Sequence, residues 1–223
     1  MDQVIVSGTA KPAFESVKAL FEKNLHRYLE DNAQLCVYVD DQCVVDLWGS
    51  ANGDTDFNGD SLINVFSSGK SLESIGMAWL VSEGLLDYDA RVVTYWPEFG
   101  GAGKADLTVA DIMRHEAGLA ALNQTLNPRD LHRDKLQANH IGAIIESHPL
   151  YYRSSDAADR REYHALTRGW IINEIFRRVD PQRRTLGTFL EQNIKNPLKA
   201  DVMIGVPPED LGRITKLKPV GLK

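Results

Sequence analysis

The chain has 223 residues, 43% of them hydrophobic and 25% charged, which fits one soluble globular domain over residues 1–223 with a sizeable core. Its formal net charge of −6 argues against nucleic acid or an anionic membrane as the main partner. No apolar run of roughly eighteen residues is present to span a bilayer, and the N-terminus lacks the pattern of a secretory signal, so a cytoplasmic location is expected.

The N-terminal part predicts a helix followed by a β-hairpin. Apolar residues recur near the helical period over residues 11–31. Residues 34–48 then alternate between apolar and polar on both sides of the turn Asp40-Asp41-Gln42. Cys36 and Cys43 lie in this hairpin, placed to face each other, and a reduced pair is expected because the protein is taken to be cytoplasmic.

Residues 67–83 predict a helix at the centre of the core, because its apolar residues occur nearly all round the helix. Asp89 is expected to cap a short helix that Pro97 ends. Residues 202–204 are expected to form a short strand. The stretch from 119 to 162 is polar and irregular apart from one helical piece. Four further helices are predicted: 109–114 behind a capping box formed by Thr108 and Asp111, 139–147, 166–179, and one beginning at Thr185.

Ser67 and Lys70 are the first candidate catalytic residues. They lie three positions apart at the start of a predicted helix, so their side chains share one face. A serine becomes nucleophilic when a neighbouring base takes its proton, and a desolvated lysine can do so. The apolar helix surface around Lys70 is expected to desolvate it. Alternatives without chemistry are an N-cap role for Ser67 and a solvated surface position for Lys70.

Several ordered motifs surround this pair. They are D-L-W-G at 46–49, V-F-S-S-G-K at 65–70, E-G-L-L-D-Y-D at 83–89, L-T-V-A-D-I-M-R-H-E-A-G-L at 107–119 and E-Y-H-A-L-T-R-G-W at 162–170. In this order they resemble the serine β-lactamase-related family, which joins class C β-lactamases to penicillin-binding-protein-like carboxylesterases and D-aminopeptidases. The resemblance covers about residues 5–206. It implies an α/β (α+β) fold of the β-lactamase/transpeptidase type, with a helical subdomain packed on an antiparallel sheet.

The resemblance also implies roles for individual residues. Ser67 matches the acylated nucleophile, Lys70 its basic partner, and Tyr163 the tyrosine of a second motif, Y-x-N, that assists proton transfer. The sequence leaves open whether Lys70 or Tyr163 is the base, and Tyr163 can also be read as a core residue with a satisfied hydroxyl. His164 is added as a substrate-binding candidate. The expected activity is that of a serine hydrolase that forms an acyl-enzyme with a small ester or amide, without cofactor or metal.

Two departures from the family pattern shape this prediction. Ala165 stands where the family has an asparagine that helps to hold a substrate amide, which favours a carboxylesterase over a β-lactamase. The third motif, K-T-G or H-x-G, does not occur after Tyr163, and the chain ends at Lys223, before the family's remaining strands and closing helix are expected. The chain is therefore expected either to be poorly active alone or to have its sheet completed by a second copy or another chain. The alternative function is a catalytically impaired relative that binds a ligand or partner.

Other patterns predict no further site. Asn64 stands where a phosphate-binding loop ending in Gly69-Lys70-Ser71 needs a glycine, which argues against nucleotide binding. His115-Glu116 lacks the second histidine of H-E-x-x-H, which argues against a zinc site. The pairs at 160–161 and 183–184, all arginines, are expected on solvated faces.

Overall fold

The structure is a computed structural model that describes residues 4–28, 30–136, 138–152 and 161–218. These residues form two compact units. The sheet unit comprises residues up to Asn64 together with the segment from Pro207, and the helical unit runs from Val65 to Val206. The fold class predicted from the sequence, mixed α/β with a small antiparallel sheet, is confirmed.

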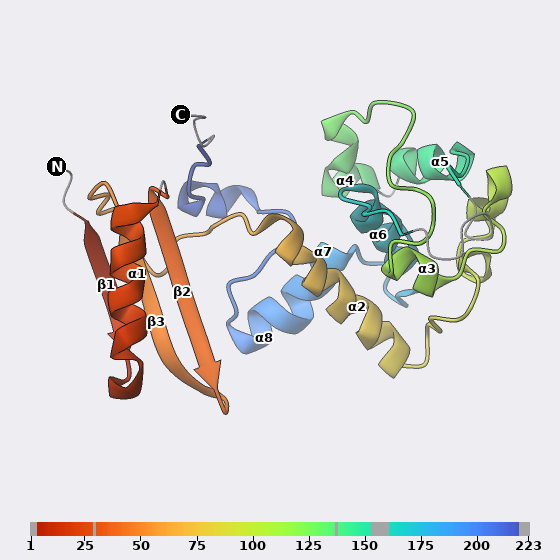
Figure 1. The fold of residues 1–223 in the computed structure, drawn as a ribbon. Coiled ribbons are helices and arrows are strands. Elements are labelled where there is room, and N and C mark those ends of the chain that lie inside the picture. The colour runs from red at the N-terminus through yellow and green to blue at the C-terminus, as the bar shows by residue number, and fades with distance from the viewer. Residues whose placement is uncertain (1–3, 29, 137, 153–160, 219–223) are drawn as a thin grey trace. The chain divides into compact units, whose positions relative to one another are not determined.

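The sheet unit is a three-stranded antiparallel sheet with one helix packed on it (Figure 1). Its elements are β1 (Ile5–Ala10), α1 (Glu15–Arg27), β2 (Asn32–Val39) and β3 (Gln42–Ser50), with β3 in the centre. α1 buries Phe21 and Leu25 against Val45 and Leu47 of β3. The C-terminal segment adds a 3-10 helix, Pro208–Arg213, and a parallel bridge from Ile214 to Leu62.

The hairpin of β2 and β3 agrees with its prediction. Asp40 and Asp41 both have positive φ, +47° and +60°, as a two-residue type I′ turn requires. The sulfur atoms of Cys36 and Cys43 lie 3.9 Å apart and both thiols are free, so the prediction of a facing pair is confirmed.

The sequence predicts no strand before the first helix, whereas the structure has β1 there. It pairs with β3 from Ile5↔Ser50 to Ala10↔Val45. Gly8 sits in its middle with φ +98°, and a Cβ there would lie 2.0 Å from the carbonyl oxygen of Asp46. A glycine inside a short run weakens the strand signal, although this backbone contact with β3 is the reason that a glycine is needed. The following helix is also shorter than predicted, since Pro12–Phe14 is a 3-10 turn.

The helical unit contains α2 to α8 and several 3-10 segments (Figure 1). α2 contacts α6 and α7, and Trp79 of α2 stacks against Phe189 of α7 at 4.6 Å between ring centres. The α-helices are α2 (Lys70–Ser82), α3 (Val109–Met113), α4 (Arg133–Leu136), α5 (His140–Ser147), α6 (Thr167–Val179), α7 (Leu186–Leu190) and α8 (Asn196–Leu198), with a π-helical stretch at Glu191–Lys195. The fully buried large apolar side chains include Trp96, Phe99, Ile112, Leu119, Ile145 and Ile171.

The predicted helix caps are present where their chemistry is local. Thr108 and Asp111 form the reciprocal capping box at the start of α3, and the hydroxyl of Thr185 accepts from the N–H of Thr188 at the start of α7. Asp89 does not cap a helix. The 3-10 turn Val92–Thr94 has Arg91 at its N-cap, and Pro97 begins a 3-10 segment, Pro97–Gly103, instead of ending a helix.

Three other predictions in the helical unit are wrong. Residues 202–204 form no strand. α2 is not buried on all sides, because it buries Gly76, Met77 and Leu80 while the side chain of Ile75 is exposed. Arg184 does not lie on a solvated face, because it forms an ion pair with buried Asp180 at 2.7 Å. Arg160 lies outside the described residues.

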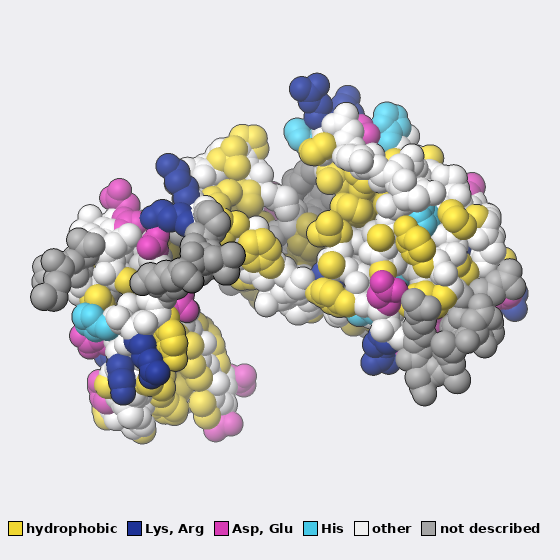
Figure 2. Space-filling view, turned by 45° about the horizontal axis from the view of Figure 1, so that its top comes forward, with side chains coloured by type: hydrophobic (Ala, Val, Ile, Leu, Met, Phe, Trp, Pro, Cys, Tyr) yellow, Lys and Arg dark blue, Asp and Glu magenta, His cyan; other side chains and the backbone are white. Residues whose placement is uncertain are grey.

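Apolar side chains also reach the surface of the helical unit (Figure 2). The large ones near the start of α2 and before α6 are Val65, Phe66, Tyr163 and Leu166. Within the described part of the chain, no helix combines the length and the apolar character needed to cross a membrane. The same residues contain no group of three or more His, Cys, Asp or Glu side chains arranged to hold a metal ion.

Candidate active site

Ser67 lies in a short 3-10 helix, Phe66–Gly69, that leads directly into α2. Its side chain is exposed, and the N-cap of the 3-10 helix is Val65, so the alternative reading of Ser67 as an N-cap residue is wrong. Phe66 has a φ of +46°, a left-handed conformation that is uncommon for a bulky residue. Strained backbone of this kind is found at functional sites, where the surrounding fold maintains it.

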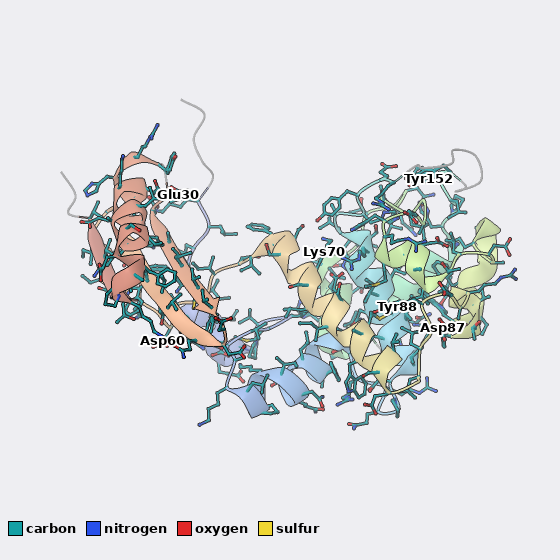
Figure 3. All side chains as sticks on the ribbon, turned by 60° about the horizontal axis from the view of Figure 1, so that its bottom comes forward. Glu30, Asp60, Lys70, Asp87, Tyr88 and Tyr152 are labelled. Carbon is teal, nitrogen blue, oxygen red and sulfur yellow. The ribbon has the colours of Figure 1, made fainter. Side chains whose placement is uncertain are left out.

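Lys70 begins α2 (Figure 3). Its Nζ lies 3.3 Å from the Ser67 hydroxyl and donates to the main-chain oxygen of Ala165 at 2.7 Å. The same ammonium lies 5.1 Å from the centre of the Tyr163 ring. Lys70 is half-buried among these polar partners, so neither the solvated surface lysine nor the apolar surroundings expected from the sequence describe it.

Tyr163 completes the cluster from a position 93 residues after Lys70 in the chain. Hydrogen bonds first to Ser67 and then to Lys70 lower the pKa of its phenol, and the charges of Lys70 and Arg168 act in the same direction. The side chain remains exposed, so it is not the core tyrosine of the alternative reading. The structure thus brings together Ser67, Lys70 and Tyr163 within the helical unit.

His164 is placed differently from the sequence expectation. It is fully buried, and its Nε2 accepts from the N–H of Leu119 at 2.9 Å while its Nδ1 lies 2.6 Å from the main-chain oxygen of Glu162. Both ring nitrogens are therefore engaged inside the protein. This corrects the substrate-binding role, because a buried ring with both nitrogens occupied holds the backbone together and offers nothing to a substrate.

A buried ion pair lies one helical turn beyond Lys70. Glu73 on α2 faces Arg168 on α6 at 3.5 Å, and both side chains are largely buried. Burial raises the pKa of Glu73, against the opposing charges of Arg168 and then Lys70. Arg168 also contacts the hydroxyl of Ser74 at 3.2 Å. This ion pair is not predicted from the sequence. Its local signal is the position of Glu73 three residues after Lys70, which places both side chains on one face of α2.

Residues 17–218 match the Beta-lactamase protein family. The chain belongs to the Beta-lactamase family. Among curated proteins it is 34% identical over 209 residues to the esterase/beta-lactamase LipL of Mycobacterium tuberculosis, covering 92% of this chain and 46% of that protein. Family membership agrees with the resemblance seen in the motifs.

Several solved structures are similar to this chain. A penicillin-binding protein homologue from Caulobacter crescentus superimposes with a TM-score of 0.84 at 31% identity, covering 98% of this chain and 57% of that one. A family VIII carboxylesterase has a TM-score of 0.84 at 32% identity, covering 97% and 58%. A class C β-lactamase from Rhodobacter sphaeroides, at 18% identity and a TM-score of 0.60, shares the fold. The chain spans about half the length of these relatives.

Proposed function

We propose that this Beta-lactamase-family hydrolase is a serine hydrolase that forms an acyl-enzyme on Ser67. The observation that carries the proposal is the meeting of a hydroxyl, an amine and a phenol: Ser67, Lys70 and Tyr163 are within hydrogen-bonding reach of one another. Relatives that are named as an esterase/beta-lactamase and as a carboxylesterase support a hydrolase. For that reason the non-enzymatic alternative is not favoured.

Tyr163 is the proposed base. Its lowered phenol pKa increases the fraction of phenolate at a given pH, and the Lys70 ammonium beside the ring stabilises that negative charge. The Ser67 proton passes to Tyr163 as Oγ bonds to the carbonyl carbon of the substrate. The phenol then gives the proton to the departing alcohol as the C–O bond breaks, leaving an ester on Ser67. A water molecule then attacks the carbonyl carbon of this ester and gives its proton to Tyr163. The phenol returns the proton to Ser67 Oγ as the acid is released.

The N–H of Ser67 is the proposed donor to the tetrahedral oxyanion. It lies in the first turn of the 3-10 helix Phe66–Gly69, where backbone N–H groups and the helix dipole favour negative charge. The family resemblance assigns a second donor to the K-T-G or H-x-G motif, which residues 164–223 do not contain.

Esters are the proposed substrates in preference to β-lactams. The position that carries an amide side chain in the Y-x-N motif is Ala165 in this chain, which has no polar side chain and whose main-chain oxygen accepts from Lys70. An ester has no amide N–H or ring nitrogen for such a side chain to recognise. A small ester with a good leaving group, such as p-nitrophenyl butyrate, is the natural first substrate.

A fluorophosphonate probe followed by peptide mass spectrometry tests the proposal directly. The probe should label Ser67 in the folded protein and not in the heat-denatured protein, and Ser67→Ala should abolish both labelling and hydrolysis of p-nitrophenyl butyrate. Ser71→Ala is the matched control, because Ser71 lies four residues on and its hydroxyl only donates to the oxygen of Ser68. A folded protein in which Ser67 is never labelled, or a Ser67→Ala variant with undiminished turnover, would refute the proposal.

A further inference from the structure

The backbone on both sides of Tyr163 is bonded to a single residue, His115. The N–H of Glu162 donates to the main-chain oxygen of His115 at 3.1 Å. The N–H of His164 donates to the Nδ1 atom of the His115 ring at 3.0 Å. The ring of His115 also packs against the ring of Tyr163, with 4.8 Å between their centres. His115 thus contacts Tyr163 and both of its chain neighbours, although 48 residues separate it from Tyr163.

This arrangement fixes the chemical state of the His115 ring. A ring nitrogen that accepts a hydrogen bond cannot carry a proton, so the other nitrogen, Nε2, holds the hydrogen of the neutral ring. Burial lowers the pKa of His115 to about 4, and the nearby charges of Arg168 and Lys70 add to the effect. The ring is therefore neutral near pH 7, which is the state that the contact with His164 requires.

The backbone of His115 is itself unusual. It has a φ of +65°, the left-handed region that most residues other than glycine and asparagine avoid. This conformation turns the chain at the end of α3. Four residues later, the N–H of Leu119 donates to Nε2 of His164 at 2.9 Å. The main-chain oxygen of Leu119 accepts from the Thr167 hydroxyl at 2.6 Å. The turn after α3 and the segment before α6 are therefore joined along their length.

We propose that His115 is a positioning residue for the reaction: by accepting the N–H of His164 and bonding Glu162, it holds the Tyr163 phenol against Ser67 and Lys70. The phenol and its two partners come from separate parts of the helical unit, since Ser67 and Lys70 lie at the start of α2. The bonds from the turn after α3 hold the backbone on both sides of Tyr163, and the bond from Lys70 to the main-chain oxygen of Ala165 holds the segment from α2. This inference rests on the proposed function, because it assigns His115 a task only if Tyr163 takes part in catalysis.

An ion pair beside His115 provides a matched control. Arg161 and Glu116 also connect the two segments, at 2.6 Å, and Arg161 is largely exposed. Exposed ion pairs of this type contribute little to stability, because water and salt screen their charges. Glu116→Gln removes the negative charge of this pair at the residue next to His115 and should leave the activity within about twofold of wild type.

The test compares His115→Asn with His115→Gly. Both residues tolerate a φ of +65°, and the Oδ1 atom of asparagine occupies the place of Nδ1 in histidine, whereas glycine offers no acceptor. In assays with p-nitrophenyl butyrate, we expect His115→Gly to lower kcat about 10- to 100-fold with little change in KM. His115→Asn should stay within about threefold of wild type. Equal loss in the two variants, or no loss in either, would overturn the proposal. Circular dichroism and thermal melting check that both variants fold.

A double-mutant cycle separates this inference from the proposed function. In a Tyr163→Phe background, His115→Gly should have almost no further effect, because the group that it positions is gone. If the two losses multiply, His115 acts through something other than Tyr163 and the inference fails while the proposed function stands. If Tyr163→Phe and Ser67→Ala both leave turnover intact, the proposed function itself has failed.

The state of the ring can be measured without any substitution. Long-range ¹H–¹⁵N spectra of histidine-labelled protein at pH 7 should show His115 as a neutral ring with its hydrogen on Nε2. A charged ring, or a hydrogen on Nδ1, would overturn the proposal because the N–H of His164 would then have no acceptor.

Discussion

The Nζ atom of Lys70 lies 2.7 Å from the main-chain oxygen of Ala165, so the lysine contacts the residue that takes the asparagine position of the Y-x-N motif. Ala165 is exposed, and its Cβ is all that the side chain offers to a substrate. The lysine is therefore held by the backbone at this position and does not depend on the side chain. We therefore expect that the side chain at position 165 can be changed without moving the lysine.

Ala165→Asn tests whether position 165 contacts the substrate. The new carboxamide should offer a hydrogen bond to the amide of a β-lactam and none that a simple ester can use. One such bond is worth about 1 kcal/mol, so the ratio of kcat/KM for nitrocefin to that for p-nitrophenyl butyrate should rise about five- to tenfold. Ala165→Leu adds a side chain of similar size without the amide and should not raise the ratio. An unchanged ratio in Ala165→Asn would show that position 165 does not contact the substrate.

Tyr163→Phe should remove the proposed base and lower kcat about 10²- to 10⁴-fold. The pKa of the phenol is lowered, so the phenolate forms, and activity rises, as the pH increases through a value below the ordinary 10. The acidic limb of kcat/KM against pH should therefore lie below pH 10 in the wild type and be absent from Tyr163→Phe. Tyr151→Phe, which changes an exposed tyrosine stacked on His148, should retain the limb. The same limb in Tyr163→Phe would assign it to another group.

The sequence predicts what depends on nearby residues. The capping box at Thr108 and Asp111 is complete within four residues, and Ser67 and Lys70 meet because three positions along a helix return to one face. The hairpin follows from alternation and a two-residue turn of aspartates. Each of these signals lies within the element that it predicts or directly next to it.

Contacts between distant segments escaped prediction. His115 and His164 are 49 positions apart, and Arg168 and Ser74 are 94 apart, so no periodicity links them. Tyr163 was found through its motif and not through any local pattern. His164 is predicted to bind the substrate, whereas the structure buries its ring completely, and no local sequence pattern indicates this burial. β1 was missed because Gly8 hides the strand pattern while serving the contact with Asp46.

Arg168→Met should destabilise the protein by about 3 kcal/mol, because it leaves Glu73 buried without its main counter-charge. The loss should depend on pH. Burial raises the pKa of Glu73 above its ordinary 4.5, so this group's contribution to stability is complete below pH 4.5 and is lost as the pH rises through the folded-state pKa. Removing Arg168 raises that pKa further. The deficit measured by urea unfolding should therefore be larger at pH 7 than at pH 4.5.

Glu73→Gln in the Arg168→Met background is the control for this prediction, since a neutral amide needs no counter-charge. It should recover most of the loss at pH 7 and change little at pH 4.5. An Arg168→Met deficit that is the same at both pH values would show that the packing of the arginine, and not its charge, stabilises the contact between α2 and α6.

Lys104 is a buried cation whose ammonium has three acceptors. Its Nζ donates to the main-chain oxygens of Gly101, Glu146 and His148 at 2.8, 2.9 and 2.6 Å, and the side chain is fully buried. Two of these oxygens belong to the C-terminal end of α5, where a positive charge also complements the helix dipole. Lys104→Met keeps the length of the side chain but leaves these carbonyl groups without their donor. We expect a loss of about 3 kcal/mol in urea unfolding at pH 7.

The pH dependence of this loss has a definite sign. Burial lowers the pKa of Lys104 to about 8 from an ordinary 10.5, so between these values the unfolded chain binds the proton and the folded protein does not. Raising the pH from 8 to 10.5 therefore increases the stability that Lys104 contributes. The difference in the free energy of unfolding between wild type and Lys104→Met should grow over this range. Lys135→Met, at an exposed lysine beside Asp134, should stay within about 0.5 kcal/mol of wild type at every pH. If the difference in stability between wild type and Lys104→Met became smaller as the pH rises, the carbonyl groups would hold the Lys104 proton more tightly than water does.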